Sequence, residues 1–184
     1  MIVFSKVRWK NFLSTGNAWT EIDLNRSIST LIIGDNGAGK STILDAMTFG
    51  LFGVPFRRIK KGQLVNSINN REAVVEVEFS IGKKDYLVRR GIKPNVLDIL
   101  VGGQPLDQKA AIKDQQILLE KNILGLNFKS FTQVVILGSA TFTPFMQLPS
   151  SSRKEVIENL LDIEIFTVMN NLLKERVKKM KEDT

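Results

Sequence analysis

Alternating apolar and polar positions predict the strands of this chain. Residues 2–12 alternate in this way, with Val3, Val7 and Trp9 on one face and Lys6, Arg8 and Lys10 on the other, and predict a half-solvated strand. Residues 19–24 are expected to pair with it as a hairpin. Runs at 73–81, 86–90 and 97–101 are separated by short turns, and together they predict an antiparallel meander.

Apolar residues three or four positions apart predict three helices. The first follows Ser41, and the second covers residues 109–124. The third begins at a capping box, Ser152 to Glu155, and runs to the end of the chain. Its thin apolar seam indicates the start of a coiled coil, formed by Phe166, Met169, Leu173, Val177 and Met180. We therefore expect a lobe over residues 1–149 and a coiled-coil helix over residues 150–184.

The hydrophobic pattern leaves one segment open. Residues 131–137 end in the apolar run Val-Val-Ile-Leu, which fits either a buried strand or a turn of helix. Periodicity alone does not choose between the two.

A phosphate-binding loop lies between the first strands and the first helix. Residues 30–33 predict a buried strand, and residues 34–41 match G-x-x-x-x-G-K-[ST] at every fixed position. Glycines allow successive N–H groups to face one anion, and the helix N-terminus adds partial positive charge. The residues expected to hold ATP here are Asn36, Gly37, Ala38, Gly39, Lys40, Ser41 and Thr42.

Individual roles follow from side-chain chemistry. Lys40 is expected to reach the β- and γ-phosphates and to be the catalytic residue of this chain, and Thr42 to hold the α-phosphate. The Ser41 hydroxyl is a hard oxygen ligand that suits Mg²⁺. Ser14 lies in a turn that can fold toward the nucleotide. Lys60 and Lys61 belong to a dense basic run after the first helix, which is expected to serve the nucleotide or water.

Composition narrows the class of protein. The 184 residues suffice for one compact domain with an appendage, and the formal charge of +7 suits an anionic partner such as nucleic acid. Cysteine and histidine are both absent, which excludes disulfides and the usual zinc sites. No run approaches the ~20 apolar residues of a membrane span, and we expect no membrane association and a cytoplasmic location.

One part of a nucleotide-hydrolysing site is missing. A phosphate loop works with a second acidic residue, usually at the end of an apolar strand, that completes Mg²⁺ coordination and positions the attacking water. No acidic residue of this sequence has that context. The sequence therefore predicts half of a nucleotide-binding domain, whose other half lies beyond a coiled coil or in another chain.

Several segments carry a family resemblance. They are residues 10–14, the phosphate loop and its helix over 31–49, residues 56–62, and the long helix that begins near Ser152. Together they resemble the N-terminal lobe of SbcC-like DNA-repair ATPases, an SMC-related family that also includes the Rad50 subunit of break-repair complexes. Segments 49–53, 60–64 and 143–146 are similar to its bacteriophage members.

The resemblance implies a fold and a set of partners. The fold is α/β, an ABC-type P-loop ATPase half-domain with a mixed sheet around the phosphate-loop helix, an antiparallel sheet and an outgoing coiled-coil helix. The C-terminal lobe would supply the signature motif, the Mg²⁺-binding Asp and the catalytic Glu. Two heads would form a homodimer around ATP, and an SbcD-like nuclease subunit and double-stranded DNA would complete the assembly.

The sequence departs from the family pattern at two positions. Leu13 stands where relatives carry an arginine, so a phosphate contact from that side chain is missing. Ser139 stands where many relatives carry the glutamine of the Q-loop, and its hydroxyl is the implied second ligand for Mg²⁺. Two other classes share the motifs: an architectural SMC-type DNA clamp without a nuclease partner, and a transporter nucleotide-binding domain, which the coiled coil and long hairpin disfavour.

Basic residues away from the phosphate loop are the candidates for DNA contact. They lie on the strands of the meander, on the following helix and on the outgoing coil, and are Arg89, Arg90, Lys93, Lys109, Lys113, Lys178 and Lys179. The alternative is that these cations form an ordinary solvated face.

Overall fold

The computed structural model describes residues 1–106, 111–136, 143–161 and 163–182. Its internal contacts divide the chain into two compact units, Met1–Leu124 and Gly125–Thr184. The expected boundary between residues 149 and 150 falls within the second of them.

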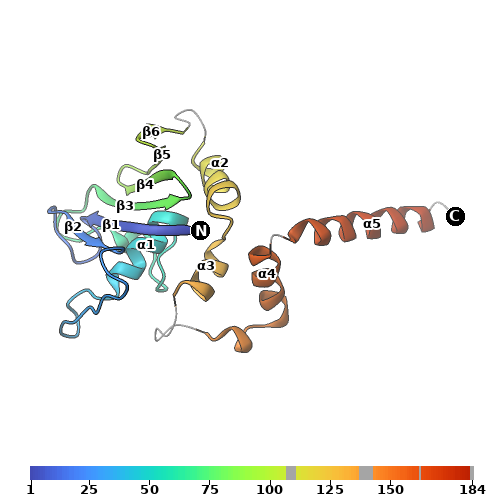
Figure 1. Ribbon diagram of the computed structural model, residues 1–184, viewed down its shortest axis with the longest axis horizontal. Coiled ribbons are helices and arrows are strands. Elements are labelled where there is room, and N and C mark those ends of the chain that lie inside the picture. The colour runs from blue at the N-terminus through green and yellow to red at the C-terminus, as the bar shows by residue number, and fades with distance from the viewer. Residues whose placement is uncertain (107–110, 137–142, 162, 183–184) are drawn as a thin grey trace. The chain divides into compact units, whose positions relative to one another are not determined.

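The first unit is built on one antiparallel sheet (Figure 1). In spatial order its strands are β2 Thr20–Asp23, β1 Ile2–Lys10, β3 Ala73–Ile81, β4 Lys84–Ile92, β5 Val96–Val101 and β6 Gln104–Pro105. Every neighbouring pair is antiparallel. The hairpin and the meander predicted from alternation are both confirmed.

A shift of register in β1 changes which residues face the core. Pairing with β3 slips between Phe4 and Lys6, so the alternation reverses there. Val7 and Trp9 are buried as expected, whereas Val3 is 37% exposed. Phe4 takes the inward position instead, with its ring centroid 5.7 Å from that of Phe79 on β3.

Helix α1, Thr42–Phe52, packs on the buried face of this sheet. Gly50 permits the close approach, because a Cβ atom there would lie 2.6 Å from Cγ2 of Val77 on β3. The helix ends at Gly53, whose left-handed backbone (φ 73°) lets its N–H donate to the carbonyl of Phe49. The phosphate-loop helix is therefore held against the centre of the sheet.

The predicted buried strand at residues 30–33 is wrong. The segment has no strand structure, and Leu31, Ile32 and Ile33 are 82%, 45% and 84% exposed. A strand needs a neighbour to pair with its backbone and a layer to cover its side chains. In the described ranges, no strand pairs with this segment.

Two helical segments complete the first unit. The short 3-10 helix η1, Lys61–Leu64, begins at the last residue of the basic run. Helix α2, Ile112–Ile117, continues directly as the π-helical turn η2, Leu118–Leu124, and Gly125 follows with φ 61°. The predicted helix over 109–124 is confirmed from Ile112 onward, whereas Ala111 is extended, and Ile112, expected inside, is 38% exposed.

Among the described residues of the second unit, all the regular elements are helices. They are α3 Phe128–Val134, the 3-10 turn η3 Phe145–Gln147, α4 Ser150–Leu160 and α5 Glu164–Glu182. The helical alternative thus holds for the open segment up to Val134. The predicted capping box is wrong, because α4 begins two residues before Ser152, and the long helix is interrupted between α4 and α5.

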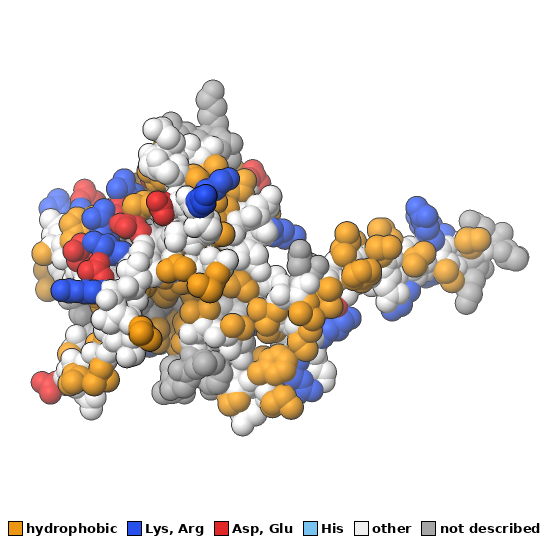
Figure 2. Space-filling model, in the orientation of Figure 1, with side chains coloured by type: hydrophobic (Ala, Val, Ile, Leu, Met, Phe, Trp, Pro, Cys, Tyr) orange, Lys and Arg blue, Asp and Glu red, His pale blue; other side chains and the backbone are white. Residues whose placement is uncertain are grey.

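Helix α5 carries the predicted apolar seam on its surface. Phe166, Met169, Leu173, Val177 and Met180 are all at least half exposed. Figure 2 shows hydrophobic side chains gathered along this helix. No helix within the described ranges is long and apolar enough to cross a membrane.

Candidate nucleotide-binding site

The phosphate loop forms a tight curl ahead of α1. Gly37 and Gly39 both have φ 92°, a left-handed backbone that side chains rarely adopt. The curl is closed by hydrogen bonds from the N–H of Ala38 to the carbonyl of Asp35 (3.1 Å) and from the N–H of Thr42 to the carbonyl of Gly39 (2.9 Å). Several backbone N–H groups are thereby gathered at the start of the helix, where the dipole is positive.

The side chain of Lys40 lies along the same curl. Its ammonium donates to the carbonyls of Gly34 (2.6 Å) and Asp35 (2.7 Å), and the side chain is exposed. These bonds hold a point charge beside the N–H groups of the loop. The arrangement suits a polyphosphate, which needs both backbone donors and a cation.

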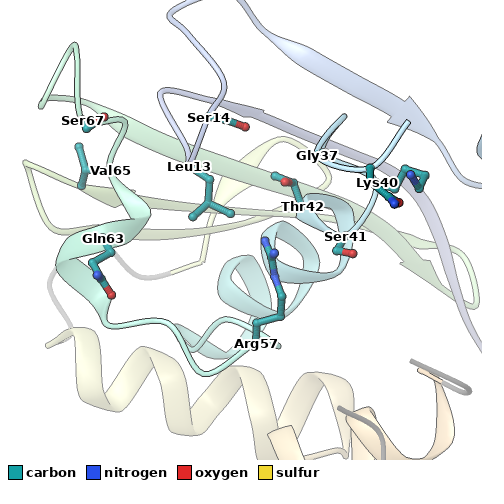
Figure 3. A pocket seen from close by; sticks show the side chains of 12 residues that line it. Leu13, Ser14, Gly37, Lys40, Ser41, Thr42, Arg57, Gln63, Val65 and Ser67 are labelled. Carbon is teal, nitrogen blue, oxygen red and sulfur yellow. The ribbon is translucent and has the colours of Figure 1, made fainter. Parts of the chain in front are cut away.

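A cavity of about 520 Å³ opens over the loop (Figure 3). The phosphate loop and the start of α1 form one side of it, and two other segments, residues 13–14 and 63–67, form the other. The lining residues are Leu13, Ser14, Asn36, Gly37, Gly39, Lys40, Ser41, Thr42, Arg57, Gln63, Val65 and Ser67. Seven of them were predicted as nucleotide contacts.

Arg57 is fixed at the edge of this cavity by a buried carboxylate. Asp45 on α1 has no exposed surface and accepts hydrogen bonds from the backbone N–H (2.9 Å) and Nε (2.7 Å) of Arg57. Nη2 of the same guanidinium lies 2.5 Å from Oδ2, the oxygen that also accepts from Nε, while the backbone N–H donates to Oδ1. Charge-assisted bonds of this kind hold a planar guanidinium in one orientation. The sequence signal that could have pointed to this pair is that Asp45 is the one charged residue of helix 42–52.

Three residues of the expected nucleotide set do not line the cavity. Ala38 lies between Gly37 and Gly39, which do. Lys60 directly precedes η1, and Lys61 is its first residue and donates to Oδ1 of Asn95 at 3.0 Å. Ser139, the implied second Mg²⁺ ligand, lies outside the described residues.

The donor set of the cavity fits a hard cation bound together with phosphate. The Ser41 hydroxyl lines the cavity next to Lys40, directly before the first turn of α1. In the described ranges no group of three His, Cys, Asp or Glu side chains could hold a metal ion. Mg²⁺ binds in such sites mainly through phosphate and water oxygens with few protein ligands, and the Ser41 hydroxyl would be one of these ligands.

Arg90 was predicted to contact DNA, but its side chain is not available for that contact. The side chain is buried beneath the C-terminus of α1, where Nε donates to the carbonyl of Gly50 (2.9 Å) and Nη2 to that of Leu51 (3.2 Å). Nη2 also donates to the amide oxygen of Gln116 on α2. Desolvation lowers the pKa of Arg90 to about 10, and the charge of Glu120 opposes that shift. The guanidinium is therefore still a cation at neutral pH, and its hydrogen bonds hold the end of α1 and Gln116 within the protein.

The other predicted DNA contacts lie at the surface where they are described. Arg89 is paired across the outer face of the sheet, since Arg8 and Arg89 both donate to the buried carboxylate of Glu76. Lys93 donates to Oδ1 of Asn70 at 2.6 Å and is exposed. Lys113 lies on α2, whereas Lys178 and Lys179 lie on α5 in the second unit. Lys109 lies outside the described residues.

Fold and cavity together define the class of the protein. A phosphate loop that leads into a helix packed on an antiparallel sheet is the N-terminal lobe of an ABC-type P-loop ATPase. A family model described as an AAA domain matches residues 6–184, and the chain belongs to that family.

Similar proteins agree with the predicted resemblance. Exonuclease subunit 2 of Enterobacteria phage T4 is 45% identical over 92% of this chain and 30% of its own length. The DNA double-strand break repair Rad50 ATPase of Thermoplasma acidophilum is 30% identical over 95% of this chain and 19% of its own length. The chain thus spans less than a third of the length of these two relatives. The Smc head domain of Pyrococcus furiosus, 20% identical, matches 100% of this chain and 48% of its own with a TM-score of 0.61, which shows a shared fold.

Proposed function

We propose that this chain is the ATP-binding lobe of an SbcC-like ATPase that couples ATP-driven pairing of two heads to the binding and nucleolytic processing of DNA ends. The observation that supports it best is the cavity over the phosphate loop, where loop N–H groups, the Lys40 ammonium and the Ser41 hydroxyl face one space. One similar protein is named Exonuclease subunit 2, which supports a role in a nuclease complex.

Three polar side chains of the cavity have roles that suit phosphoryl transfer. Lys40 offers a charge to the β- and γ-phosphates, and Ser41 an oxygen to Mg²⁺, which neutralises charge on the leaving group. Arg57, oriented by Asp45, offers a further cation at the cavity edge. No described acidic side chain lines the cavity, so the residue that orients the attacking water has to come from elsewhere.

The exposed apolar segment at residues 31–33 supports a second lobe as the source of that residue. Three large apolar side chains in sequence, directly before the phosphate loop, are the composition of a buried strand. A strand supplied by a C-terminal lobe would pair with this backbone and cover these side chains.

The seam of α5 supports a coiled coil as the link to that lobe. Phe166, Met169, Leu173, Val177 and Met180 advance by three or four residues and are exposed, which suits a partner helix. An SbcD-like nuclease subunit is the further partner we propose.

Double-stranded DNA is proposed to bind through its phosphates. The contributing cations are Arg89, Lys93, Lys109, Lys113, Lys178 and Lys179. Arg90 is left out because its donors are used beneath α1. A purely architectural DNA clamp would share these features and would differ only in lacking a nuclease partner.

ATP turnover by residues 1–184 compared with the full-length protein tests the half-domain proposal. We expect the full-length protein to hydrolyse ATP and residues 1–184 to bind ATP without measurable turnover, because phosphoryl transfer depends on the positioned water and balanced charge. Lys40→Ala in the full-length protein distinguishes its turnover from a contaminating ATPase. Turnover by residues 1–184 that Lys40→Ala abolishes would show that this lobe already holds the missing acidic residue.

A further inference from the structure

A buried amide joins the two segments that form the cavity wall opposite the phosphate loop. Asn66, 6% exposed, donates from Nδ2 to the carbonyls of Leu13 (3.2 Å) and Thr15 (3.1 Å). Its Oδ1 accepts from the N–H groups of Ile68 and Asn69, both at 3.0 Å. An amide has two donor hydrogens and two acceptor lone pairs, and all four are used here.

Backbone bonds add to the same junction. The N–H of Asn66 donates to the carbonyl of Asn11 (2.8 Å), and the N–H of Leu13 donates to the carbonyl of Leu64 (2.6 Å). Asn69 donates from its side chain to Oδ1 of Asn11 at 2.7 Å. Residues 11–15 and 64–69 are thus tied together at several points, with Asn66 at the centre.

The segment that Asn66 holds has a conformation that it would not keep unaided. Leu13 has φ 53°, a left-handed backbone that costs a side-chain-bearing residue of order 1 kcal/mol or more. Such a conformation persists where surrounding bonds determine it. Because Leu13 and Ser14 line the cavity, the bonds from Asn66 to the carbonyls of Leu13 and Thr15 set the position of this wall.

The two sides of the cavity differ in chemistry. The loop side carries Lys40, Ser41 and backbone N–H groups, which suit phosphate. The wall held by Asn66 carries two apolar side chains, two hydroxyls and one amide, from Leu13, Val65, Ser14, Ser67 and Gln63, and none of these is charged. Figure 3 shows Gln63, Val65 and Ser67 on the opposite side of the view from Lys40 and Ser41. An uncharged wall with hydrogen-bonding groups suits the nucleoside part of a nucleotide.

We propose that Asn66 is a positioning residue that fixes the nucleoside-facing wall of the cavity, and that it sets affinity for the nucleoside without affecting affinity for the polyphosphate. The inference rests on the proposed function, because it assumes that the phosphate loop binds ATP. Asn66 itself does not line the cavity, and it acts through the 13–15 segment.

The decisive comparison is between two ligands that share their phosphates. Binding of MgATP and of Mg-tripolyphosphate to the full-length protein is measured by calorimetry for wild type and Asn66→Asp. The aspartate has the same shape but no donors, so its oxygens face the carbonyls of Leu13 and Thr15. We expect ATP affinity to fall about tenfold or more, as the loss of two buried hydrogen bonds implies. Tripolyphosphate affinity should stay within about twofold.

Two further variants distinguish an effect on the position of the cavity wall from a general loss of protein stability. Val88→Ala removes core volume on β4, away from the cavity, and should lower the melting temperature without changing the ratio of the two affinities. Thr15→Val keeps the shape of a half-buried side chain in the same segment and removes the hydroxyl that donates to the carbonyl of Phe12 at 2.6 Å and accepts from the N–H of Phe12 at 3.3 Å. It should lower the affinity for ATP, but not for tripolyphosphate, by a smaller factor than Asn66→Asp does. If Asn66→Asp does not fold, Thr15→Val is used for the test in its place.

The outcomes are distinguishable. Wild-type protein that binds neither ligand would overturn the proposed function itself. Wild-type protein that binds both ligands equally well would overturn the inference alone, because the wall would then contribute nothing. Equal losses for both ligands in Asn66→Asp, or no loss for ATP, would likewise overturn it.

Discussion

Gly50→Ala is predicted to destabilise the protein even though alanine is the better helix former. The new Cβ would lie 2.6 Å from Cγ2 of Val77 and 3.2 Å from Cγ1 of Val75. The first distance is about 0.8 Å shorter than the 3.4 Å at which ordinary van der Waals contact begins. Both valines are fully buried and branched at Cβ, so neither can rotate out of the way. Helix α1 has to move away from the sheet.

The magnitude follows from two opposing effects. Overpacking of a buried site costs about 1–3 kcal/mol, and replacing glycine by alanine within a helix gains about 1 kcal/mol. The net expectation is a loss of about 1 kcal/mol in the free energy of unfolding. Gly62→Ala is the matched control, because nothing lies within 4 Å of a Cβ atom there, and it should not destabilise.

The assay is urea unfolding followed by tryptophan fluorescence, for which Trp9, 2% exposed on β1, reports the core. A double-mutant cycle with Val77→Ala identifies the cause, because removing Cγ2 should relieve the clash and give a coupling energy of about 1–3 kcal/mol, the cost of overpacking itself. Gly50→Ala protein that is as stable as wild type, or additivity in the cycle, would refute the close packing of α1 on β3.

Three further predictions concern the metal, the buried arginine and DNA. Ser41→Ala should weaken ATP binding in the presence of Mg²⁺ and leave metal-free ATP binding unchanged; wild-type affinity that is equal with and without Mg²⁺, measured by calorimetry, would contradict it. Arg90→Met should lower the free energy of unfolding by about 1–3 kcal/mol, since the carbonyl of Gly50 loses its side-chain donor; unchanged denaturant midpoints would refute it. Lys109→Glu with Lys113→Glu should reduce the slope of log affinity against log salt by about one to two and weaken all duplexes alike. The control for that pair is Lys83→Glu with Lys84→Glu, where Lys83 lies in the β3–β4 turn and Lys84 begins β4. An unchanged slope in Lys109→Glu with Lys113→Glu, measured by fluorescence anisotropy, would remove α2 from the DNA site.

The parts of the fold that depend on local pattern could be predicted from the sequence. Residues 73–81 alternate and form β3 over the same range, and the glycine-rich motif at 34–41 gives the curled loop. In each case the sequence pattern and the element that it predicts lie within the same dozen residues. The nucleotide set of the phosphate loop was found for the same reason.

Features that depend on distant partners could not be predicted in this way. Residues 31–33 have the composition of a strand, but a strand forms only where another backbone pairs with it. Arg90 looks like a surface cation in an alternating strand, and only the position of α1 shows that its donors meet helix carbonyls. Asn66 and Gln63 carry no motif, because their roles arise from segments some fifty residues apart in sequence.

ATP hydrolysis by the full-length protein with Lys40→Ala tests the central claim most directly. The side chain is exposed, and its hydrogen bonds within the described residues go to loop carbonyls, so the variant should fold with an unchanged melting temperature. We predict loss of turnover, because this is the one cation of the loop itself. Lys83→Ala, on the β3–β4 turn, should retain full turnover. Turnover at the wild-type rate in folded Lys40→Ala protein would contradict the assignment of this cavity as the ATP site.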